Sequence, residues 1–279
     1  MSRLLALDIG NSECKLALFV GREVARSTRV PSHPAPDRQQ MRGAVRALLG
    51  ADAATPPSAL CSAVPELAGS WREALEGEVT SVFQVEGPEV ARAGLRVCRM
   101  RPESVGADRL VGALAAWTVC GGPVVVVNAG TATVVDAVSA EGEFLGGAIA
   151  PGVAMGLRSL AAGTALLPRV EPADPGEVIG ADTAAAMRSG VIYGTVGAIR
   201  ELSARMRAVV AAEATLVLTG GFAPLLSPHL EAGHLHLPYL TLEGVHLAWQ
   251  AHTANATVGP RQAQPVGPAP SAAHGSEGP

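Results

Sequence analysis

The residues best suited to chemistry lie near the start of the chain, in a polar turn between two apolar runs. Residues 4–20 read LLALDIGNSECKLALFV, and the turn carries one carboxylate, Asp8, and one ammonium group, Lys15, the only lysine in the chain. Gly10 lets the backbone pass close to a ligand. Backbone N–H groups, short polar side chains and a carboxylate together suit phosphate oxygens and a hydrated Mg²⁺. An ordinary β-hairpin with a polar turn is the alternative for this stretch.

The pattern of an apolar strand followed by a glycine turn occurs twice more. Residues 124–138 read VVVVNAGTATVVDAV, and residues 215–223 read TLVLTGGFA. In the second turn Thr131 and Thr133 carry hydroxyl groups that suit phosphates, while Asp136 lies on the following strand. Three such turns, near the start, in the middle and in the later part of the chain, predict a duplicated domain with a nucleotide between its halves.

Another candidate site precedes an apolar helix pattern. The apolar spacing from Leu110 predicts a helix, which puts Asp108 and Arg109 in or just before its first turn, at the positive end of the helix dipole. The Asp108 carboxylate could accept a proton from a substrate hydroxyl, and the Arg109 guanidinium could bind a substrate carboxylate. The alternative is that Asp108 caps the helix and Arg109 is solvated.

Composition restricts the class of protein. The 279 residues are 48% apolar and 16% charged, which is typical of a packed globular protein with a large core. A formal charge of −4 without a basic cluster argues against nucleic-acid binding, and no apolar run predicts a membrane span. The four cysteines lack paired metal or redox spacing, and no signal peptide precedes the first strand, so we expect a cytoplasmic protein.

Strands and helices alternate between these motifs, which predicts an α/β layer fold. Helices are expected over residues 40–49, 68–75 and 155–160, and strands over residues 60–64 and 79–86. A long helical region is expected over residues 182–207, with an N-cap among residues 180–183 and interruptions near Gly190 and Gly194.

The later part of the chain offers two weaker candidate sites and a tail. The glycines of residues 146–152 precede a helix and suit either an anion site or a tight chain crossing. His234 and His236 would share one face of a strand, but no acidic or cysteine ligand has metal-site spacing near them, so a metal pair is disfavoured. Residues 259–279 are rich in Pro, Gly, Ala and Ser, which predicts a disordered tail.

Taken together, the motifs resemble those of the type III pantothenate kinases, a branch of the actin-like and sugar-kinase-like ATPase superfamily. The matching segments are collinear: DIGNS, SAVP, PESVGADR, NAGTATVVD, GGAIAPG, ALLPRVE, GADTAAAMRSG and TGGFAPLL. The resemblance implies two actin-like, ribonuclease-H-like domains, expected over residues 1–120 and 121–258, with the nucleotide in the cleft between them. It also implies a homodimer that phosphorylates pantothenate with ATP and Mg²⁺, the first step towards coenzyme A.

The resemblance implies a role for each matching residue. Asp108 would be the general base, and Asp8 would hold Mg²⁺ through water. The residues expected at the ATP phosphates are Asp8, Ile9, Gly10, Asn11, Ser12, Glu13, Cys14, Lys15 and Thr131. The residues expected at pantothenate are Gly106, Ala107, Asp108, Arg109, Thr183 and Arg99.

Two positions depart from the family pattern. The family binds K⁺ or NH₄⁺ through an aspartate that opens the second motif, where this chain has Asn128, which keeps a carbonyl oxygen but lacks the charge. Arg99 stands where the family often has an aromatic residue that contacts the substrate.

Two alternatives to an active pantothenate kinase therefore stay open. One is a non-catalytic or regulatory relative that binds nucleotide or pantothenate without turnover, and the other is a kinase for a different small hydroxylated acid.

Overall fold

The structure, a computed structural model, describes residues 2–50, 55–98 and 104–255. Two of the expectations above, the role of Arg99 and the disordered tail over residues 259–279, lie outside the described residues. Within the described ranges, no helix combines the length and the apolar character that crossing a membrane would need.

The first sheet is built around the N-terminal hairpin. Strands β1 (Arg3–Ile9), β2 (Glu13–Val20) and β3 (Glu23–Pro31) form an antiparallel meander. Strand β4 (Ser58–Ser62) pairs in parallel with β1, and β5 (Val82–Gln84) pairs in parallel with β4, which gives the order β3-β2-β1-β4-β5. Because β1 and the middle of β2 are buried on both faces, their sequences are nearly continuous apolar runs.

The second sheet repeats this arrangement. Strands β7 (Val124–Ala129), β8 (Ala132–Val138) and β9 (Glu143–Pro151) form the meander, and β10 (Thr215–Thr219) and β11 (Leu235–His236) add in parallel beside β7. The order is β11-β10-β7-β8-β9-β6, so that only β6 (Arg96–Val97), at the edge, has no counterpart in the first sheet. The duplication that the glycine turns predicted is therefore confirmed.

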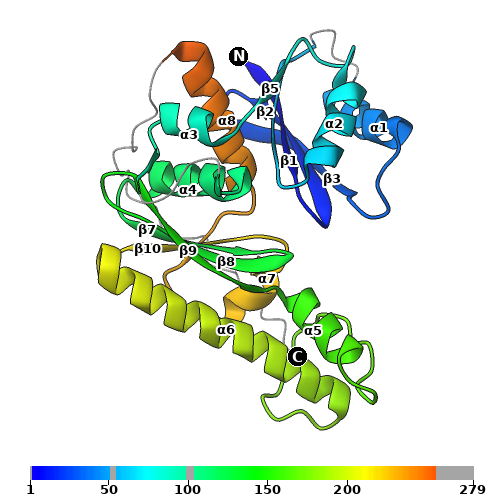
Figure 1. Cartoon of the computed structure of the whole chain (residues 1–279), viewed down its shortest axis with the longest axis vertical. Helices are drawn as coiled ribbons and strands as arrows, with labels where there is room; N and C mark the ends of the chain where they lie inside the picture. The colour runs from blue at the N-terminus through cyan, green and yellow to red at the C-terminus, as the bar shows by residue number, and fades with distance from the viewer. Residues whose placement is uncertain (1, 51–54, 99–103, 256–279) are drawn as a thin grey trace, which may run out of the picture.

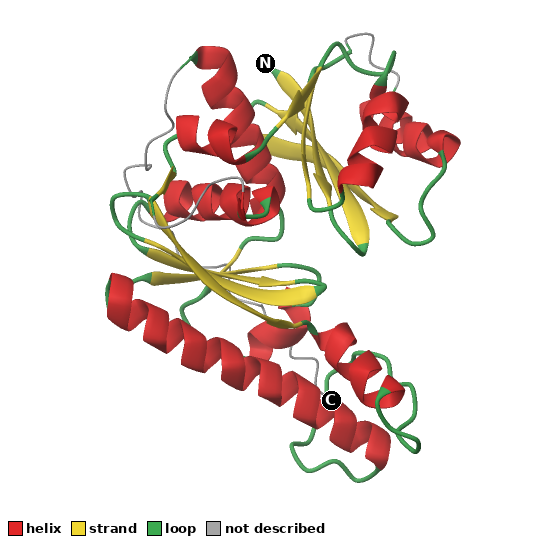
Figure 2. Cartoon of the chain, viewed as in Figure 1, coloured by secondary structure: helices red, strands yellow, loops and turns green. Residues whose placement is uncertain are grey.

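The helices complete a layered α/β fold (Figures 1 and 2). Helices α1 (Arg38–Leu49) and α2 (Pro65–Leu75) cover the outer face of the first sheet. Helices α4 (Ala107–Cys120) and α8 (Leu240–Ala254), with α3 (Gly87–Arg92), lie between the two sheets. Helices α5 (Val153–Ala162) and α6 (Thr183–Val210) cover the outer face of the second sheet, and the short helices α7 (Ala223–Leu226) and η2 (Ser227–His229) follow β10.

Alternating residues of β7 fix which helices cover which face of the second sheet. Val124 and Val126 belong to the core that contains α4 and α8, whereas Val125 and Val127 belong to the core that contains α6. Successive side chains of a strand point to opposite faces, so α4 and α6 lie on opposite sides of this sheet.

Two elements cross between the halves of the sequence. Strand β6 lies before residue 120 yet pairs with β9 of the second sheet, and α8 lies after residue 121 yet packs against α4 and β1. The crossing of α8 and α4 is close, because a Cβ at Gly244 would lie 1.9 Å from the carbonyl oxygen of Val111. The division into domains at residues 1–120 and 121–258 stays a prediction.

The predicted interruptions of the long helix are wrong. Helix α6 runs without a break through Gly190 and Gly194. A glycine inside a helix costs only about 1 kcal/mol relative to alanine. Buried side chains before, between and after these glycines, namely Met187, Ile192 and Val196, pack α6 against the sheet and outweigh that cost.

The predicted starts of three helices, α1, α2 and α5, are two or three residues late. Helix α1 begins at Arg38 because Asp37 caps it and accepts a hydrogen bond from the backbone N–H of Gln40 at 2.8 Å. Helix α2 begins at Pro65, which suits the first turn of a helix because proline has no N–H to leave unpaired there.

Candidate active site

The three glycine turns meet where the two sheets approach each other. The hydroxyl groups of Ser12, in the turn after β1, and Thr131, in the turn after β7, form a hydrogen bond of 2.6 Å. A Cβ at Gly221, after β10, would lie 3.8 Å from Nη1 of Arg29 and 4.0 Å from Oε1 of Glu13. Segments more than 100 residues apart in sequence thus form one polar surface.

Close backbone packing around these turns requires glycine. Gly220 has a φ of +99°, and a Cβ on it would lie 2.4 Å from the carbonyl oxygen of Ala129. A Cβ at Gly152 would lie 2.3 Å from the carbonyl oxygen of Thr131 and 2.4 Å from that of Gly130. Of the two interpretations of residues 146–152, the close contact at Gly152 fits the tight chain crossing, which supports the turn that carries Thr131.

Asp8 is a buried carboxylate at the end of β1. Only 6% of the residue is exposed, and its Oδ2 lies 3.6 Å from Nζ of Lys15. The thiol of Cys61, on β4, donates a hydrogen bond of 3.7 Å to Oδ1. Burial raises the pKa of Asp8, the Lys15 ammonium group opposes this shift, and the negative charge of Asp108 adds to it. The site therefore holds two carboxylates, Asp8 and Asp108, near enough to influence each other.

Asp108 and Arg109 lie in the first turn of α4, as the apolar spacing predicted. The N-cap residue is Gly106, and a Cβ there would lie 2.6 Å from Oδ1 of Asp108. The alternative, in which Asp108 is the cap and Arg109 is solvated, is wrong. Gly106 occupies the cap position, and the Arg109 side chain is 18% exposed and paired with a carboxylate.

The partner of Arg109 is Asp136 on β8. Nε and Nη2 of Arg109 donate hydrogen bonds of 3.1 and 2.5 Å to the two carboxylate oxygens of Asp136. Burial raises the pKa of Asp136, and the ion pair with Arg109 opposes that shift. The guanidinium also lies 5.6 Å from the centre of the Phe144 ring, in a cation–π contact. Asp136 has no role among the predictions from the sequence, although a carboxylate inside an apolar strand is itself a signal.

Three residues of the first motif use their side chains for folding. Ile9 is fully buried in the core, and Glu13 forms an ion pair of 2.9 Å with Arg29. The sulfur of Cys14 accepts a hydrogen bond of 3.2 Å from the indole N–H of Trp71. The backbone of these three residues is also paired in the sheet, so Ser12 and Lys15 are the residues of this motif whose side chains can reach a phosphate.

Thr183 and Thr133 lie on the other side of the second sheet from Asp108. Thr183 is the first residue of α6 and is exposed, whereas Asp108 begins α4 on the opposite face. The structure thus does not bring Thr183 and Asp108 of one chain together. Thr133 lines a groove beside α6, and its buried hydroxyl oxygen has no hydrogen-bond partner among the described residues.

The polar surface has few groups that could hold a metal ion. Asp8 suits Mg²⁺, which keeps most of its water and takes one or two carboxylates together with substrate phosphates. Asn128 places its amide oxygen beside the second turn, where a Cβ at Gly130 would lie 3.4 Å from it. Across residues 2–50, 55–98 and 104–255, no three His, Cys, Asp or Glu side chains form a metal-binding group. The ring nitrogens of His234 instead contact Ser227 and the carbonyl oxygen of Glu231.

Comparisons with known proteins extend over most of the chain. A family model described as type III pantothenate kinase matches residues 4–205. The type III pantothenate kinase of Parafrankia sp. is 39% identical over 250 residues, which cover 90% of this chain and 98% of the relative. That of Moorella thermoacetica is 37% identical over 258 residues, which cover 90% of this chain and all of the relative.

Solved structures support the fold at lower sequence identity. A Campylobacter jejuni protein assigned to the Baf family of transcriptional activators superposes with a TM-score of 0.59 at 19% identity. The alignment covers 90% of this chain and 99% of that protein. The ethanolamine utilization protein EutJ from Carboxydothermus hydrogenoformans gives a TM-score of 0.51 at 15% identity, over 88% of this chain and 90% of that protein. At such identities the likeness concerns the fold alone.

Proposed function

Because this chain belongs to the type III pantothenate kinase family, we propose that it transfers the γ-phosphoryl group of ATP to the primary hydroxyl of pantothenate. The observation that carries the proposal is the position of Asp108 in the first turn of α4, close to Asp8 and next to the paired Arg109. The kinase relatives favour turnover over the non-catalytic alternative. Release of ADP that depends on pantothenate tests the proposal.

Each polar group near the turns has a defined part in this reaction. The Asp108 carboxylate accepts the proton of the pantothenate hydroxyl as that oxygen bonds to the γ-phosphorus. The bond from the γ-phosphorus to the β,γ-bridging oxygen breaks, and ADP leaves with its electron pair. Lys15, the hydroxyls of Ser12 and Thr131, and the backbone N–H groups of residues 11 and 12 donate to phosphate oxygens, whereas the N–H of Gly10 is bonded to the carbonyl oxygen of Glu13. Mg²⁺ held near Asp8 would neutralise phosphate charge.

The substrate side of the site is formed by the start of α4. Gly106 and Ala107 offer backbone close to Asp108, and Arg109 offers the guanidinium hydrogens that Asp136 does not use. These hydrogens would bind the carboxylate of pantothenate. We also propose that Arg99 contacts pantothenate, and this proposal rests on the family resemblance alone.

We expect catalysis to depend only weakly on K⁺ or NH₄⁺. Asn128 offers a neutral amide oxygen where a carboxylate would attract the cation, so a bound cation loses its main electrostatic partner. ADP release measured with K⁺, NH₄⁺ or Na⁺ at constant ionic strength should differ little between the three salts. The Asn128→Asp variant should gain activation by K⁺. Steep, saturable activation of the unaltered protein by K⁺ but not by Na⁺ would refute this prediction.

We propose that the protein acts as a homodimer in which Thr183 of one copy reaches the pantothenate site of the other. Within a single chain, α6, which begins at Thr183, and α4, whose first turn carries Asp108, cover opposite faces of the second sheet (Figure 1). Large apolar side chains in the segment between α5 and α6 are exposed, including Leu166 at 93%, Val178 at 66% and Ile179 at 84%. Exposed apolar residues that lie together in a structure often mark a protein interface.

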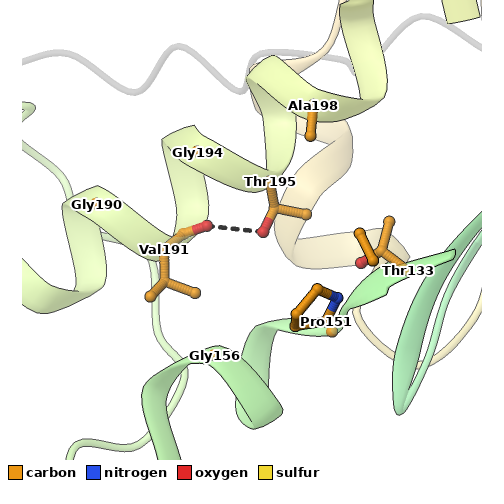
Figure 3. A pocket seen from close by; sticks show the side chains of 10 residues that line it. Thr133, Pro151, Gly156, Gly190, Val191, Gly194, Thr195 and Ala198 are labelled. Atoms are coloured by element: carbon orange, nitrogen blue, oxygen red, sulfur yellow. Dashed lines mark hydrogen bonds between the residues drawn. The ribbon is translucent and has the colours of Figure 1, made fainter. Parts of the chain in front are cut away.

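A groove beside α6 adds support for a second copy. Its wall on α6 carries Gly190, Gly194 and Ala198 at helical spacing, and α5 and the end of β9 form the opposite side (Figure 3). The groove has a volume of about 260 Å³ and an almost entirely apolar lining. Small residues on one helix face allow another chain to approach the backbone closely, which favours a protein partner here.

Mixing two inactive variants tests the shared site. Thr183→Glu would place a negative charge against the anionic substrate, and Asp108→Asn would remove the base. In a mixed dimer, one of the two sites combines Asp108 of the first variant with Thr183 of the second, so subunit exchange should restore up to about a quarter of the sites. No recovery of ADP release from a mixture shown by native mass spectrometry to contain mixed dimers would contradict the proposal.

We place the protein in the cytoplasm. Cys14 and Cys61 are buried and free, and none of the four cysteines forms a disulfide in the structure. Burial raises the pKa of both of these thiols, so they stay protonated and unreactive. Reduced cysteines and the metabolic role of the kinase relatives both suit a reducing compartment.

A further inference from the structure

The ion pair between Arg109 and Asp136 is largely enclosed, as is that between Lys15 and Asp8. The Arg109 side chain is 18% exposed and that of Asp136 is 6% exposed, and two hydrogen bonds join them. By contrast, the ion pair of Glu13 with Arg29 leaves 32% and 52% of its side chains exposed. Removing two charges from water costs free energy that their attraction often fails to recover, so stability alone is a weak reason for such a pair.

The surroundings of Asp136 leave it little freedom to move. It is paired in the sheet with Gly147 of β9, and a Cβ at Gly147 would lie 2.3 Å from Oδ1 of Asp136 and 2.0 Å from the carbonyl oxygen of Val135. Only glycine at position 147 therefore leaves room for the carboxylate. Because strands position side chains more rigidly than loops do, Asp136 forms a fixed support for the guanidinium.

The contacts of Arg109 leave one side of the guanidinium available. Nε and Nη2 face Asp136, and Cζ lies over the Phe144 ring, 5.6 Å from its centre. A guanidinium carries five N–H donors in a fixed plane, so the donors of Nη1 stay free of this carboxylate. Asp108, the proposed base, is the preceding residue, and its negative charge helps to raise the pKa of Arg109.

We propose that Asp136 is a positioning residue, which holds Arg109 so that the Nη1 side of the guanidinium meets the carboxylate of the substrate. The inference rests on the proposed function, because it assigns Arg109 to the carboxylate of pantothenate. Without such a partner, the flexible side chain of Arg109 would lose conformational entropy when the substrate binds, and this loss would weaken binding. Asp136 fixes the arginine beforehand, and the substrate hydroxyl is then aligned with Asp108.

Kinetics of the Asp136→Asn variant test the proposal. Asparagine keeps the size of the side chain but accepts only one hydrogen bond from the fork and carries no charge. We expect the KM for pantothenate to rise roughly 10- to 100-fold, the loss usual for a charged hydrogen bond, while the KM for ATP and kcat at saturation change little. Glu143→Gln is the matched control, because Glu143 pairs with Arg96 at 3.1 Å on the same sheet but is more exposed.

A double-mutant cycle separates positioning from folding. In an Arg109→Gln background, Asp136→Asn should leave the KM for pantothenate unchanged, because no guanidinium remains to be held. An equal rise of KM in both backgrounds, or a lower melting temperature with an unchanged KM, would overturn the inference. Measurements on the unaltered protein distinguish failure of this inference from failure of the proposed function. If the unaltered protein neither phosphorylates pantothenate nor binds it by calorimetry, both the proposed function and this inference fall.

Discussion

Replacing Asp108 by Asn is expected to lower kcat roughly 10²- to 10⁴-fold, the usual contribution of a general base. The amide cannot accept the proton of the pantothenate hydroxyl, and the two side chains have nearly the same size. Asp108 is the second residue of α4, with Gly106 as the N-cap, so the helix should keep its structure. Binding of ATP, measured by calorimetry with a non-hydrolysable analogue, should change little.

A control variant on another helix shows whether the loss of kcat comes from loss of the base or from removing any carboxylate at the start of a helix. Asp37 caps α1 and accepts a hydrogen bond from the backbone N–H of Gln40, away from the glycine turns. Asp37→Asn should leave kcat unchanged, because asparagine caps helices about as well as aspartate. Turnover by Asp108→Asn close to that of the unaltered protein would remove Asp108 from the role of base.

Replacing Gly152 by Ala is expected to damage both stability and ATP binding. The added methyl group would lie 2.3 Å from the carbonyl oxygen of Thr131 and 2.4 Å from that of Gly130, so backbone must move. Overpacking of this kind costs about 1–3 kcal/mol of the free energy of unfolding. Because the displaced turn carries the Thr131 hydroxyl that contacts Ser12, the KM for ATP should rise as well.

Gly122 provides the matched control for Gly152. It lies just before β7, and a Cβ there would meet nothing within 4 Å. Gly122→Ala should therefore leave the melting temperature and the KM for ATP almost unchanged. The prediction would be contradicted by a Gly152→Ala variant with the same melting temperature and the same KM for ATP as Gly122→Ala. Such a result would show that the turn at Gly130 and Thr131 has room to shift.

The parts of the fold that follow from local sequence were predictable. The hairpin at residues 4–20 and the first turn of α4 depend on apolar spacing and on turn residues close together in the chain. The duplication was visible because the strand-and-glycine pattern repeats, and the two sheets bear it out. The long helix was predicted with breaks because single glycines weaken a helix locally, whereas packing of Met187 and Ile192 against the sheet keeps α6 continuous.

Contacts between distant segments were not predictable from one sequence. Asp136 and Arg109 are 27 residues apart, and only the pairing of β8 with its neighbours brings the carboxylate under the guanidinium. Likewise, the family resemblance grouped Thr183 with Asp108, and one sequence cannot show that α4 and α6 cover opposite faces of one sheet. In both cases the missing information is which face of the sheet each side chain occupies.

The claim that this chain is a pantothenate kinase is tested by measuring ADP release by the full chain with ATP and Mg²⁺, with and without pantothenate. The expected result is ADP release that depends on pantothenate, with phosphopantothenate identified by mass spectrometry, and its loss in Asp108→Asn. A folded protein that binds ATP but releases no additional ADP when pantothenate is added, whatever monovalent cation is present, would contradict the claim.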